Sequence, residues 1–238
     1  MYSRLTLAPA DGSLLPAIAP GQFVQVAAET PGVFLRRPIS INDVDYDKNT
    51  LDLLIRKAGH GTEALIALKE GQTVNILLPL GNGFSLDAPA DSRPLLVGGG
   101  VGVAPLLYLG RKLKEAGYKP EFLLGARSAS DVLELEDFSK VGTVHVSTED
   151  GSMGEKGLVT LHSTLNSPVG RIYCCGPAPM MKAVAAIARE RNIDCEVSLE
   201  NMMACGLGAC LCCVENTVKG NVCVCTEGPV FNINMLNW

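Results

Sequence analysis

The sequence predicts a multi-domain protein with an N-terminal antiparallel β-barrel, a central α/β domain built on a doubly wound parallel sheet, and a small irregular C-terminal domain. Short strand-like runs separated by turn residues fill the first part of the chain, and strand-like and helix-like runs alternate in the middle. The last part holds six of the nine cysteines and little regular pattern. We expect the three domains to occupy residues 1–88, 89–200 and 201–238.

The first block predicts a small barrel because its apolar runs are short. They cover residues 4–8, 23–27, 51–56 and 74–79. Turn-forming pairs such as Pro20-Gly21 separate them. Short strands at this spacing favour a barrel over a βαβ unit. The chain begins close to its first strand, so we expect the opening strand of the barrel to be short or absent.

The second block alternates between the two kinds of element. Strands are expected at residues 95–97, 121–125, 143–148, 171–175 and 196–199. Helices are expected at residues 103–115, 131–138, 158–165 and 179–191. In the last helix Met181, Val184, Ala185 and Ala188 share one face at helical spacing. This alternation is typical of a doubly wound parallel sheet.

Charge and composition exclude several classes of protein. The net charge of -5 argues against a nucleic-acid groove, which needs a clustered basic face. No basic amphipathic stretch suggests a membrane-surface role, and residues 1–10 lack a signal-peptide pattern. The longest uncharged run, residues 94–110, carries five Gly and two Pro, which suit a membrane-spanning helix poorly. We therefore expect a cytoplasmic protein with neither a nucleic-acid nor a membrane partner.

The clustered cysteines are the strongest chemical signal. In a cytoplasmic protein of this size, such cysteines are more often metal ligands than disulfide partners. They follow the C-x4-C-x2-C spacing with a distant fourth cysteine that plant-type ferredoxins use for a [2Fe–2S] cluster: Cys205, Cys210, Cys213 and Cys225. Small residues between the first two let the backbone approach the sulfides. A structural zinc site is the alternative, although it would more naturally show two C-x2-C pairs. Cys212 and Cys223 break the spacing and are predicted bystanders.

A glycine-rich turn lies between the expected strand at 95–97 and the helix that follows. Gly98, Gly100 and Gly102 would let backbone amides approach a pyrophosphate at the helix N-terminus. Pro105 stands where the third glycine of G-x-G-x-x-G is expected, and Arg127 rather than an acid follows the next strand. Alone, the motif is a weak nucleotide signal, and a tight strand–helix turn is the alternative.

Two further motifs carry polar groups that suit cofactors. In the barrel block, Arg37 offers a planar fork for phosphate, and Ser40 adds a hydroxyl. By themselves these residues could belong to a solvated pair of arginines beside a strand, but Gly61 lies downstream at an expected helix start and offers a backbone amide. In the α/β block, Cys174 and Cys175 end a strand, where open α/β sheets bind ligands. Packing as small buried hydrophobes is the alternative for these cysteines.

Together these motifs resemble the ferredoxin–NADP reductase superfamily, in which an FAD-binding barrel precedes a nicotinamide-nucleotide domain. The C-terminal cysteines, with Cys225-Thr-Glu-Gly-Pro229, narrow the resemblance to the electron-transfer subunits of bacterial dihydroorotate dehydrogenase type B. The resemblance extends from about residue 4 to residue 231, and the combination is far more specific than any one motif. Ile39 departs from the superfamily, which often has tyrosine there.

The resemblance implies the cofactor contacts. The FAD-contacting residues would be Arg37, Pro38, Ile39, Ser40, Leu54, Ile55, Arg56, Gly61 and Thr62. Those facing the NAD would be Gly98, Gly100, Gly102, Pro105, Cys175, Gly176 and Pro177. The four cysteines Cys205, Cys210, Cys213 and Cys225 would hold the [2Fe–2S] cluster. The single tryptophan, Trp238, is expected at the surface or against a partner.

The resemblance also implies a function. Electrons would pass from the FMN of a dihydroorotate-oxidising catalytic subunit through the cluster and FAD to NAD+ in pyrimidine biosynthesis, within a heterotetramer of two subunits of each kind. A flavin belongs in the middle because a nicotinamide exchanges two electrons at once and a cluster only one. No catalytic acid or base is required, and the three histidines form no catalytic constellation.

Two other functions remain open at this point. One is a related NAD(P)H reductase subunit that serves ferredoxin, sulfite or sulfide chemistry, although Cys205 counts against it. The other is a zinc-stapled nucleotide-binding regulator without enzymatic activity.

Overall fold

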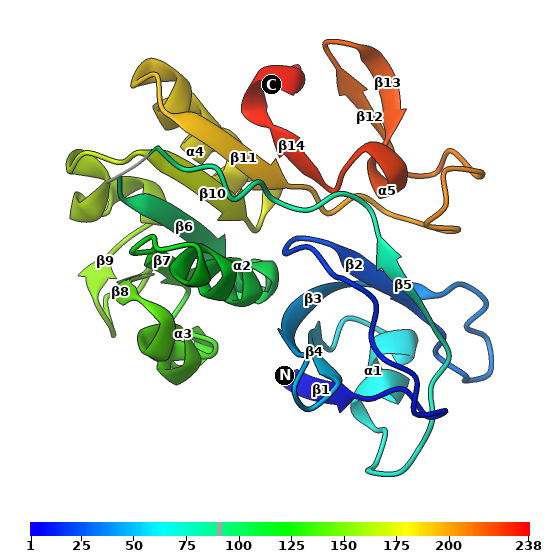
Figure 1. The fold of residues 1–238 in the computed structure, drawn as a ribbon. Coiled ribbons are helices and arrows are strands. Elements are labelled where there is room, and N and C mark those ends of the chain that lie inside the picture. Colours follow the sequence, from blue (N-terminus) through cyan, green and yellow to red (C-terminus); the bar gives the residue numbers. More distant parts are fainter. Residues whose placement is uncertain (90–91) are drawn as a thin grey trace.

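The computed structural model describes residues 1–89 and 92–238, which form a five-stranded antiparallel sheet, a seven-stranded sheet and a two-stranded hairpin (Figure 1). The antiparallel sheet and the seven-stranded sheet pack side by side, and the hairpin projects from the C-terminal segment beside them (Figure 1). The predicted order of an antiparallel block followed by an α/β block is confirmed.

The N-terminal sheet has the order β1-β4-β3-β2-β5. Its elements are β1 Tyr2–Leu7, β2 Phe23–Val26, β3 Arg37–Asp45, β4 Thr50–Arg56, α1 His60–Ile66 and β5 Ile76–Leu80. The strands β1 and β5 form the two edges, and no hydrogen-bonded ladder joins them within the described residues. The opening strand is present, because β1 pairs with β4 along its whole length. The core of this unit is apolar, and Leu65 of α1 is buried in it.

The seven-stranded sheet has the order β14-β11-β10-β6-β7-β8-β9. Its strands are β6 Pro94–Gly99, β7 Glu121–Ala126, β8 Thr143–Thr148, β9 Glu155–Lys156, β10 Arg171–Cys175, β11 Asp194–Ser198 and β14 Val230–Asn232. Two apolar cores pack against this sheet. Helices α2 Ala104–Glu115 and α3 Leu135–Val141 contribute to one core, and α4 Ala178–Glu190 contributes to the second. The helices thus cover both faces, which confirms the doubly wound arrangement. The predicted inner face of α4, from Met181 to Ala188, is buried.

Two predicted helices differ from the structure. Residues 158–165 form two 3-10 turns, Val159–Leu161 and Ser163–Asn166, because the intervening His162 has an extended backbone with ψ 138°. The helix expected at 131–138 begins only at Leu135, since Glu134 before it has a positive φ of 53°. Both corrections concern connections whose shape depends on the rest of the fold.

The C-terminal segment has more structure and more core than its sequence predicts. It contains β12 Val214–Thr217, β13 Gly220–Cys223, α5 Val224–Glu227, β14 and a final 3-10 turn, Ile233–Met235. It also contributes to an apolar core, because Val224, Phe231 and Leu236 are buried in the same cluster as α4. Trp238 packs against this cluster, with its ring centroid 5.6 Å from the Lys182 Nζ.

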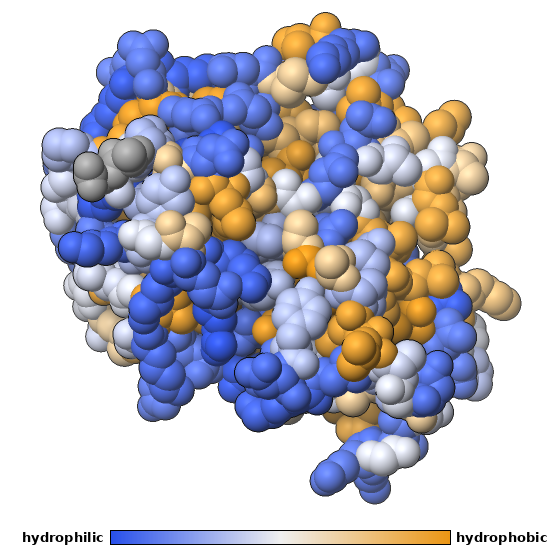
Figure 2. Space-filling view, viewed as in Figure 1, coloured by the Kyte–Doolittle hydropathy of each residue, from blue (hydrophilic) through white to orange (hydrophobic). Residues whose placement is uncertain are grey.

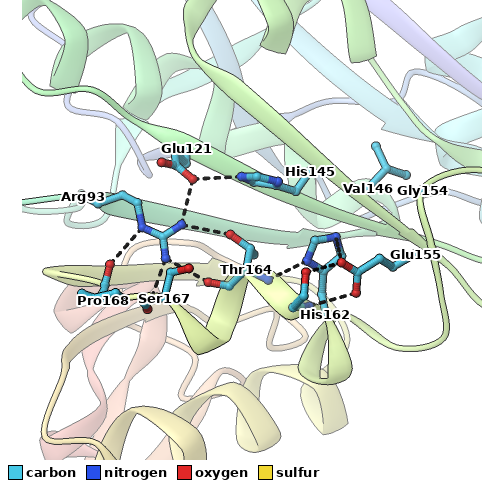
Figure 3. A pocket seen from close by; sticks show the side chains of 11 residues that line it. Arg93, Glu121, His145, Val146, Gly154, Glu155, His162, Thr164, Ser167 and Pro168 are labelled. Carbon is cyan, nitrogen blue, oxygen red and sulfur yellow. Dashed lines mark hydrogen bonds and ion pairs between the residues drawn. The ribbon is translucent and has the colours of Figure 1, made fainter.

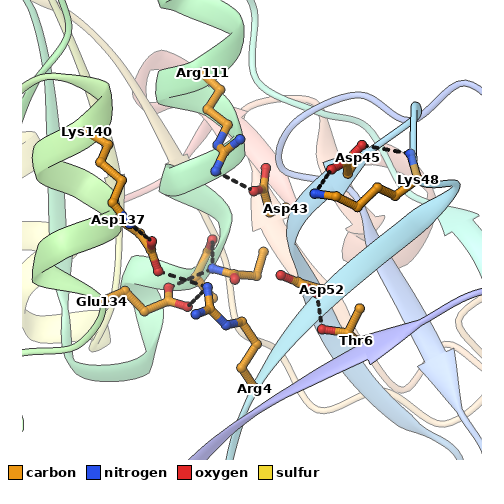
Figure 4. Close-up of polar contacts among 12 residues, drawn as sticks. Arg4, Thr6, Asp43, Asp45, Lys48, Asp52, Arg111, Glu134, Asp137 and Lys140 are labelled. Atoms are coloured by element: carbon orange, nitrogen blue, oxygen red, sulfur yellow. Dashed lines mark hydrogen bonds and ion pairs between the residues drawn. The ribbon is translucent and has the colours of Figure 1, made fainter.

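Polar contacts join the antiparallel unit to the α/β unit (Figure 4). Arg4 on β1 forms an ion pair of 2.9 Å with Asp137 on α3. Asn42 on β3 donates through its Nδ2 to the Ala104 carbonyl at 3.0 Å and to Glu134 at 2.8 Å. These contacts fix the two units against each other at the edge of α2. No helix among the described residues is long and apolar enough to cross a membrane.

A large polar pocket of about 740 Å³ lies at the amino ends of β6, β7 and β8 (Figure 3). Arg93 donates there to Glu121 at 2.8 Å and to both oxygens of Thr164 at 2.9 Å. His145 Nε2 lies 2.9 Å from the same Glu121 carboxylate. These side chains are already paired with one another. We therefore interpret their hydrogen bonds as structural contacts that hold the two 3-10 turns against the sheet.

Candidate functional site

The four predicted cluster cysteines come together between the loop of residues 201–213 and α5. The thiol of Cys210 lies beside that of Cys205, and the thiol of Cys213 lies beside those of Cys225 and Cys223. Backbone amides donate to the sulfurs: Leu207 N to Cys205 Sγ at 3.3 Å, Gly208 N to Cys225 Sγ at 3.1 Å, and Cys225 N to Cys213 Sγ at 3.4 Å. Amides directed at sulfur stabilise a thiolate.

The effect is clearest at Cys205. The Leu207 amide, followed by the amide and thiol of Cys210, lowers the pKa of Cys205 to about 6. Burial instead raises the pKa of Cys225 to about 12, although the hydrogen bond from the Gly208 N–H acts to lower it. A bound metal supplies the positive charge that such a buried thiolate needs.

Within residues 1–89 and 92–238, no three His, Cys, Asp or Glu side chains are arranged to hold a single ion. The assignment to a [2Fe–2S] cluster over a zinc ion therefore rests on the spacing of the cysteines, because a zinc site would more naturally show two C-x2-C pairs. Gly206 and Gly208 have φ of 72° and 79°, so these two turns suit glycine.

The two predicted bystanders differ in their surroundings. Cys212 is exposed, as is the predicted ligand Cys210. Cys223 Sγ is directed at the Gly208 carbonyl at 3.9 Å, and burial and the neighbouring Cys213 raise the pKa of this thiol. Cys223 therefore lies beside a predicted ligand, and its role as a bystander stays a prediction from the cysteine spacing.

The predicted FAD segments meet where β3 begins and β4 ends. The two arginines at the start of β3 have different roles, which the sequence alone did not distinguish. Arg36 is engaged with the antiparallel unit, donating to the Asn75 carbonyl at 3.0 Å and to its Oδ1 at 2.6 Å. Arg37 lies over the start of α1, so closely that a Cβ on Gly61 would be 2.5 Å from its Nε. Its guanidinium donates only a long bond of 3.5 Å to the Arg36 carbonyl among the described residues. Arg37 and the Gly61 backbone therefore form a cradle that fits a phosphate group.

Several predicted FAD residues can contribute only through their backbone. Leu54 and Ile55 have buried side chains, and Ile39 packs against the apolar core of the antiparallel unit. The Thr62 hydroxyl accepts from Ala58 N at 2.8 Å, so it shapes the turn before α1. The side chains of Pro38, Ser40 and Arg56 are not in the core.

The two predicted nicotinamide segments touch at the carboxyl ends of β6 and β10. A Cβ on Gly102 would lie 2.7 Å from the Cys175 carbonyl, and one on Gly99 would lie 3.2 Å from Pro177 Cδ. Pro105 is buried in the first turn of α2. The Cys174 and Cys175 thiols are also buried, and burial raises the pKa of each. Cys175 therefore belongs to this site through its backbone.

A cavity of about 500 Å³ opens beside these segments. Arg56, Gly99, Gly100 and Pro177 line one part of it, which places an expected FAD residue next to the nicotinamide loops. Arg127, Asp131 and Glu149 also line the cavity. Sequence reasoning missed both acids, although their positions just after β7 and β8 are the ones where parallel sheets place ligand contacts.

Comparison with known proteins identifies the family. A family model described as the iron–sulfur cluster binding domain of dihydroorotate dehydrogenase B matches residues 200–237, and an oxidoreductase NAD-binding domain matches residues 96–186. The dihydroorotate dehydrogenase B (NAD(+)) electron transfer subunit of Shouchella clausii is 43% identical over 231 residues, covering 94% of this chain and 88% of that protein. The chain belongs to this family of electron transfer subunits.

Other relatives agree with this membership. The electron transfer subunit of Listeria monocytogenes serovar 1/2a is 42% identical over 92% of this chain and 88% of its own length. Among solved structures, one described as the NADH-dependent reduced ferredoxin–NADP oxidoreductase superposes with a TM-score of 0.86 at 28% identity, covering 100% of this chain and 85% of the other. The FAD/NAD-binding domain of a Vibrio cholerae nitric oxide dioxygenase shares the fold, with a TM-score of 0.67 at 21% identity over 82% of this chain and 92% of that one.

The cofactors of this family and fold are an iron–sulfur cluster, a flavin and a nicotinamide nucleotide. The gathered cysteines, the Arg37–Gly61 cradle and the glycine-lined cavity fit these groups. A zinc-stapled regulator without activity is excluded by the family, because the protein is an oxidoreductase subunit.

Proposed function

We propose that this chain is the electron transfer subunit of an NAD-dependent dihydroorotate dehydrogenase, and that it joins an FMN-containing catalytic subunit in a heterotetramer with two copies of each. The observation that carries the proposal is the gathering of Cys205, Cys210, Cys213 and Cys225 around one loop whose backbone amides donate to their sulfurs, in a chain that also has a nicotinamide-type cavity. When bound, a cluster exchanges single electrons and a flavin couples them to the hydride of a nicotinamide.

The chain's own residues bind and orient these groups. Arg37 and the Gly61 backbone would hold a phosphate of the FAD, and the glycines that follow β6 would allow the nicotinamide nucleotide to approach the backbone. In the cavity, Glu149 and Asp131 accept hydrogen bonds from ribose hydroxyls and repel a 2′-phosphate, which favours NAD over NADP even though Arg127 lies nearby.

An exposed apolar patch supports a partner-binding face around the cluster. We call it the cluster-side patch, and it consists of Phe34, Leu35, Met202, Leu207 and Leu211. Phe34 is 96% exposed. Figure 2 shows apolar residues gathered on the side of the molecule where the β2–β3 connection and the loop of residues 201–213 lie. Apolar surface of this kind marks protein interfaces. We propose that the catalytic subunit docks here, which would bring it close to the exposed Cys210.

The function is tested with the purified chain and a catalytic subunit of the family. We expect flavin bands and broad iron–sulfur absorbance that NADH bleaches, and NAD+-dependent oxidation of dihydroorotate once the catalytic subunit is added. A chain that NADH bleaches but that supports no dihydroorotate oxidation would contradict this proposal and favour a reductase for ferredoxin, sulfite or sulfide chemistry. A colourless zinc protein would contradict the cysteine assignment as well.

The docking face is tested by Phe34→Asp. This variant should lose the complex in size-exclusion chromatography with light scattering, while the isolated chain keeps its NADH-bleached spectrum. Leu14→Asp is the matched control, because Leu14 is 82% exposed but lies outside the cluster-side patch. Retention of the complex by Phe34→Asp would contradict the assigned face.

A further inference from the structure

Gln25 on β2 is a fully buried carboxamide without a hydrogen-bond partner. Its exposure is 0%, and neither its Oε1 nor its Nε2 has a partner among the described residues. Its neighbours Val24 and Val26 are buried in the apolar core of the antiparallel unit, so strand alternation directs Gln25 to the opposite face of the sheet. Leaving a buried amide without a hydrogen-bond partner destabilises the folded state. The buried carboxamide of Gln25 therefore suggests a hydrogen-bond partner that is supplied by a bound group.

The outer face that carries Gln25 also carries part of the FAD segment. In the β2–β3 ladder Gln25 is opposite Pro38, and Phe23 is opposite Ser40. Directly opposed residues of antiparallel strands project from the same face. The Gln25 side chain therefore shares its side of the sheet with Pro38 and Ser40, which we assign to the flavin.

The other neighbour of Gln25 is the cluster loop. A Cβ on Gly206 would lie 2.8 Å from Gln25 Cγ and 2.9 Å from its Nε2. Gly206 directly follows Cys205, whose sulfur already accepts the Leu207 amide. The carboxamide is thus enclosed between the flavin segment and the loop that carries the first cluster ligand, with its Nε2 against that loop.

We propose that Gln25 donates an Nε2–H hydrogen bond to the sulfur atoms at the Cys205 end of the cluster and so raises the reduction potential of the cluster. The proposal rests on the assignment of the four cysteines as ligands. One-electron reduction makes the cluster more negative, and a donor directed at its sulfurs stabilises that charge. Gln25 would in this way adjust how readily an electron moves between the cluster and the flavin.

The first test replaces Gln25 with leucine, which is similar in size and has no donor. In an EPR-monitored redox titration of the loaded protein, we expect about a tenfold shift of the cluster toward its oxidised form at fixed potential, or about 59 mV for a one-electron couple. The FAD midpoint should stay unchanged. Gln22→Leu is the matched control, because Gln22 donates to the Gly81 carbonyl at 2.7 Å instead, and its cluster midpoint should equal that of the wild type.

A second measurement uses the wild-type residue and does not depend on the stability of a variant. The chain contains only three glutamines, Gln22, Gln25 and Gln72. Protein made by cell-free synthesis with ¹⁵N-amide glutamine should show a ¹⁵N coupling in pulsed EPR of the reduced cluster. The coupling should persist in Gln22→Leu and disappear in Gln25→Leu.

The role of Gln25 and the assignment of the four cysteines as ligands can be contradicted separately. A fully loaded Gln25→Leu protein with an unchanged cluster midpoint, or a reduced wild-type cluster without a ¹⁵N coupling, would overturn the role of Gln25 alone. A wild-type protein without an iron–sulfur spectrum would overturn the cysteine assignment and this proposal together.

Discussion

Gly102 and Gly176 are in backbone contact: a Cβ on Gly102 would lie 2.5 Å from Gly176 Cα and 2.6 Å from its nitrogen. A Cβ on Gly176 would in turn lie 3.1 Å from Gly99 N, and Gly176 has a positive φ of 155°. The turns that follow β6 and β10 therefore interlock only because these positions have no side chain. Their contact forms the floor of the expected nicotinamide site.

Gly102→Ala should disturb this floor. The backbone at Gly176 would have to move, and overpacking of this kind typically costs about 1–3 kcal/mol. We expect the KM for NADH to rise roughly tenfold in reduction of an artificial acceptor, with the FAD content unchanged. Gly117→Ala is the control, because Gly117 also has strained backbone, with a φ of 92°, but has open space around it. A Gly102→Ala protein with the wild-type KM would contradict the assignment of this turn.

Cys210 and Cys212 are both exposed and only two residues apart, yet only Cys210 contacts another predicted ligand. Cys210→Ser should abolish or strongly reduce the iron–sulfur absorbance and EPR signal, whereas Cys212→Ser should keep both. Iron and sulfide analysis of the two purified proteins measures the difference. Equal cluster content in the two variants would show that the ligand spacing has been assigned wrongly.

Arg37 and Arg36 offer a similar comparison for FAD. Arg37→Gln removes a guanidinium that is free to bind a phosphate, and hydrogen bonds to charged groups contribute about 1.5–3 kcal/mol. We expect its Kd for FAD to rise by roughly tenfold to a hundredfold, as measured by flavin fluorescence quenching. Arg36→Gln should lower the melting temperature instead, because Arg36 joins β3 to Asn75, and its Kd should stay near the wild-type value. The reverse pattern would contradict the phosphate role of Arg37.

Glu149 should determine part of the preference for NADH. The carboxylate lines the cavity together with Arg127 and Asp131, so Glu149→Gln leaves Arg127 less opposed and reduces the repulsion of a 2′-phosphate. We expect the ratio of kcat/KM for NADH to that for NADPH to fall by roughly tenfold, which corresponds to about 1.4 kcal/mol. Glu190→Gln, at the end of α4, is the control. An unchanged ratio would remove Glu149 from the ribose site.

The carboxyl of Glu134 should make stability depend on pH. Burial raises its pKa, although the hydrogen bond from Asn42 and the charge of Arg4 act to lower it. The folded chain then holds this proton more tightly than the unfolded chain does, so the contribution of Glu134 to stability falls as pH rises from the ordinary glutamate pKa of about 4.3 through the raised value.

Glu134→Gln lacks that titration. The difference in melting temperature between this variant and the wild type should therefore shift in favour of the variant as pH rises through this window, and then level off. Glu136→Gln, at an exposed position on α3, should show no comparable trend. A pH-independent difference for Glu134→Gln would mean that the carboxyl is not perturbed in the folded protein.

Local sequence determines much of this fold. The strands at 143–148 and 171–175 match β8 and β10, because β8 has valines at alternate positions, β10 is mostly apolar, and turn residues follow each of them. By contrast, β3 was not predicted as a nine-residue strand, since Pro38 and the irregular pairing between Ile41 and Asp43 disturb its alternation. The short β14 depends on a free edge at β11, which is a property of the folded sheet.

In the candidate site, too, some residues could be predicted from local sequence and others depend on the folded structure. Three of the four cluster cysteines lie on one loop, so their spacing alone predicts the chemistry. Asp131 and Glu149 come from two separate connections that meet only when β7 and β8 pair. Gln25 carries no local signal at all, because its significance depends on Gly206, which is distant in sequence but adjacent in space.

The pairing of β14 with β11 limits how far the cysteine-bearing segment can move. β11 and β14 are neighbours, with Ser198 opposite Val230 and Glu196 opposite Asn232. The cysteine-bearing stretch between them is therefore an insertion between adjacent strands, anchored at both ends, and not an appendage on a tether. A segment held in this way does not swing like a mobile carrier domain. The electron would instead cross a fixed gap, whose length is determined when the sheet folds.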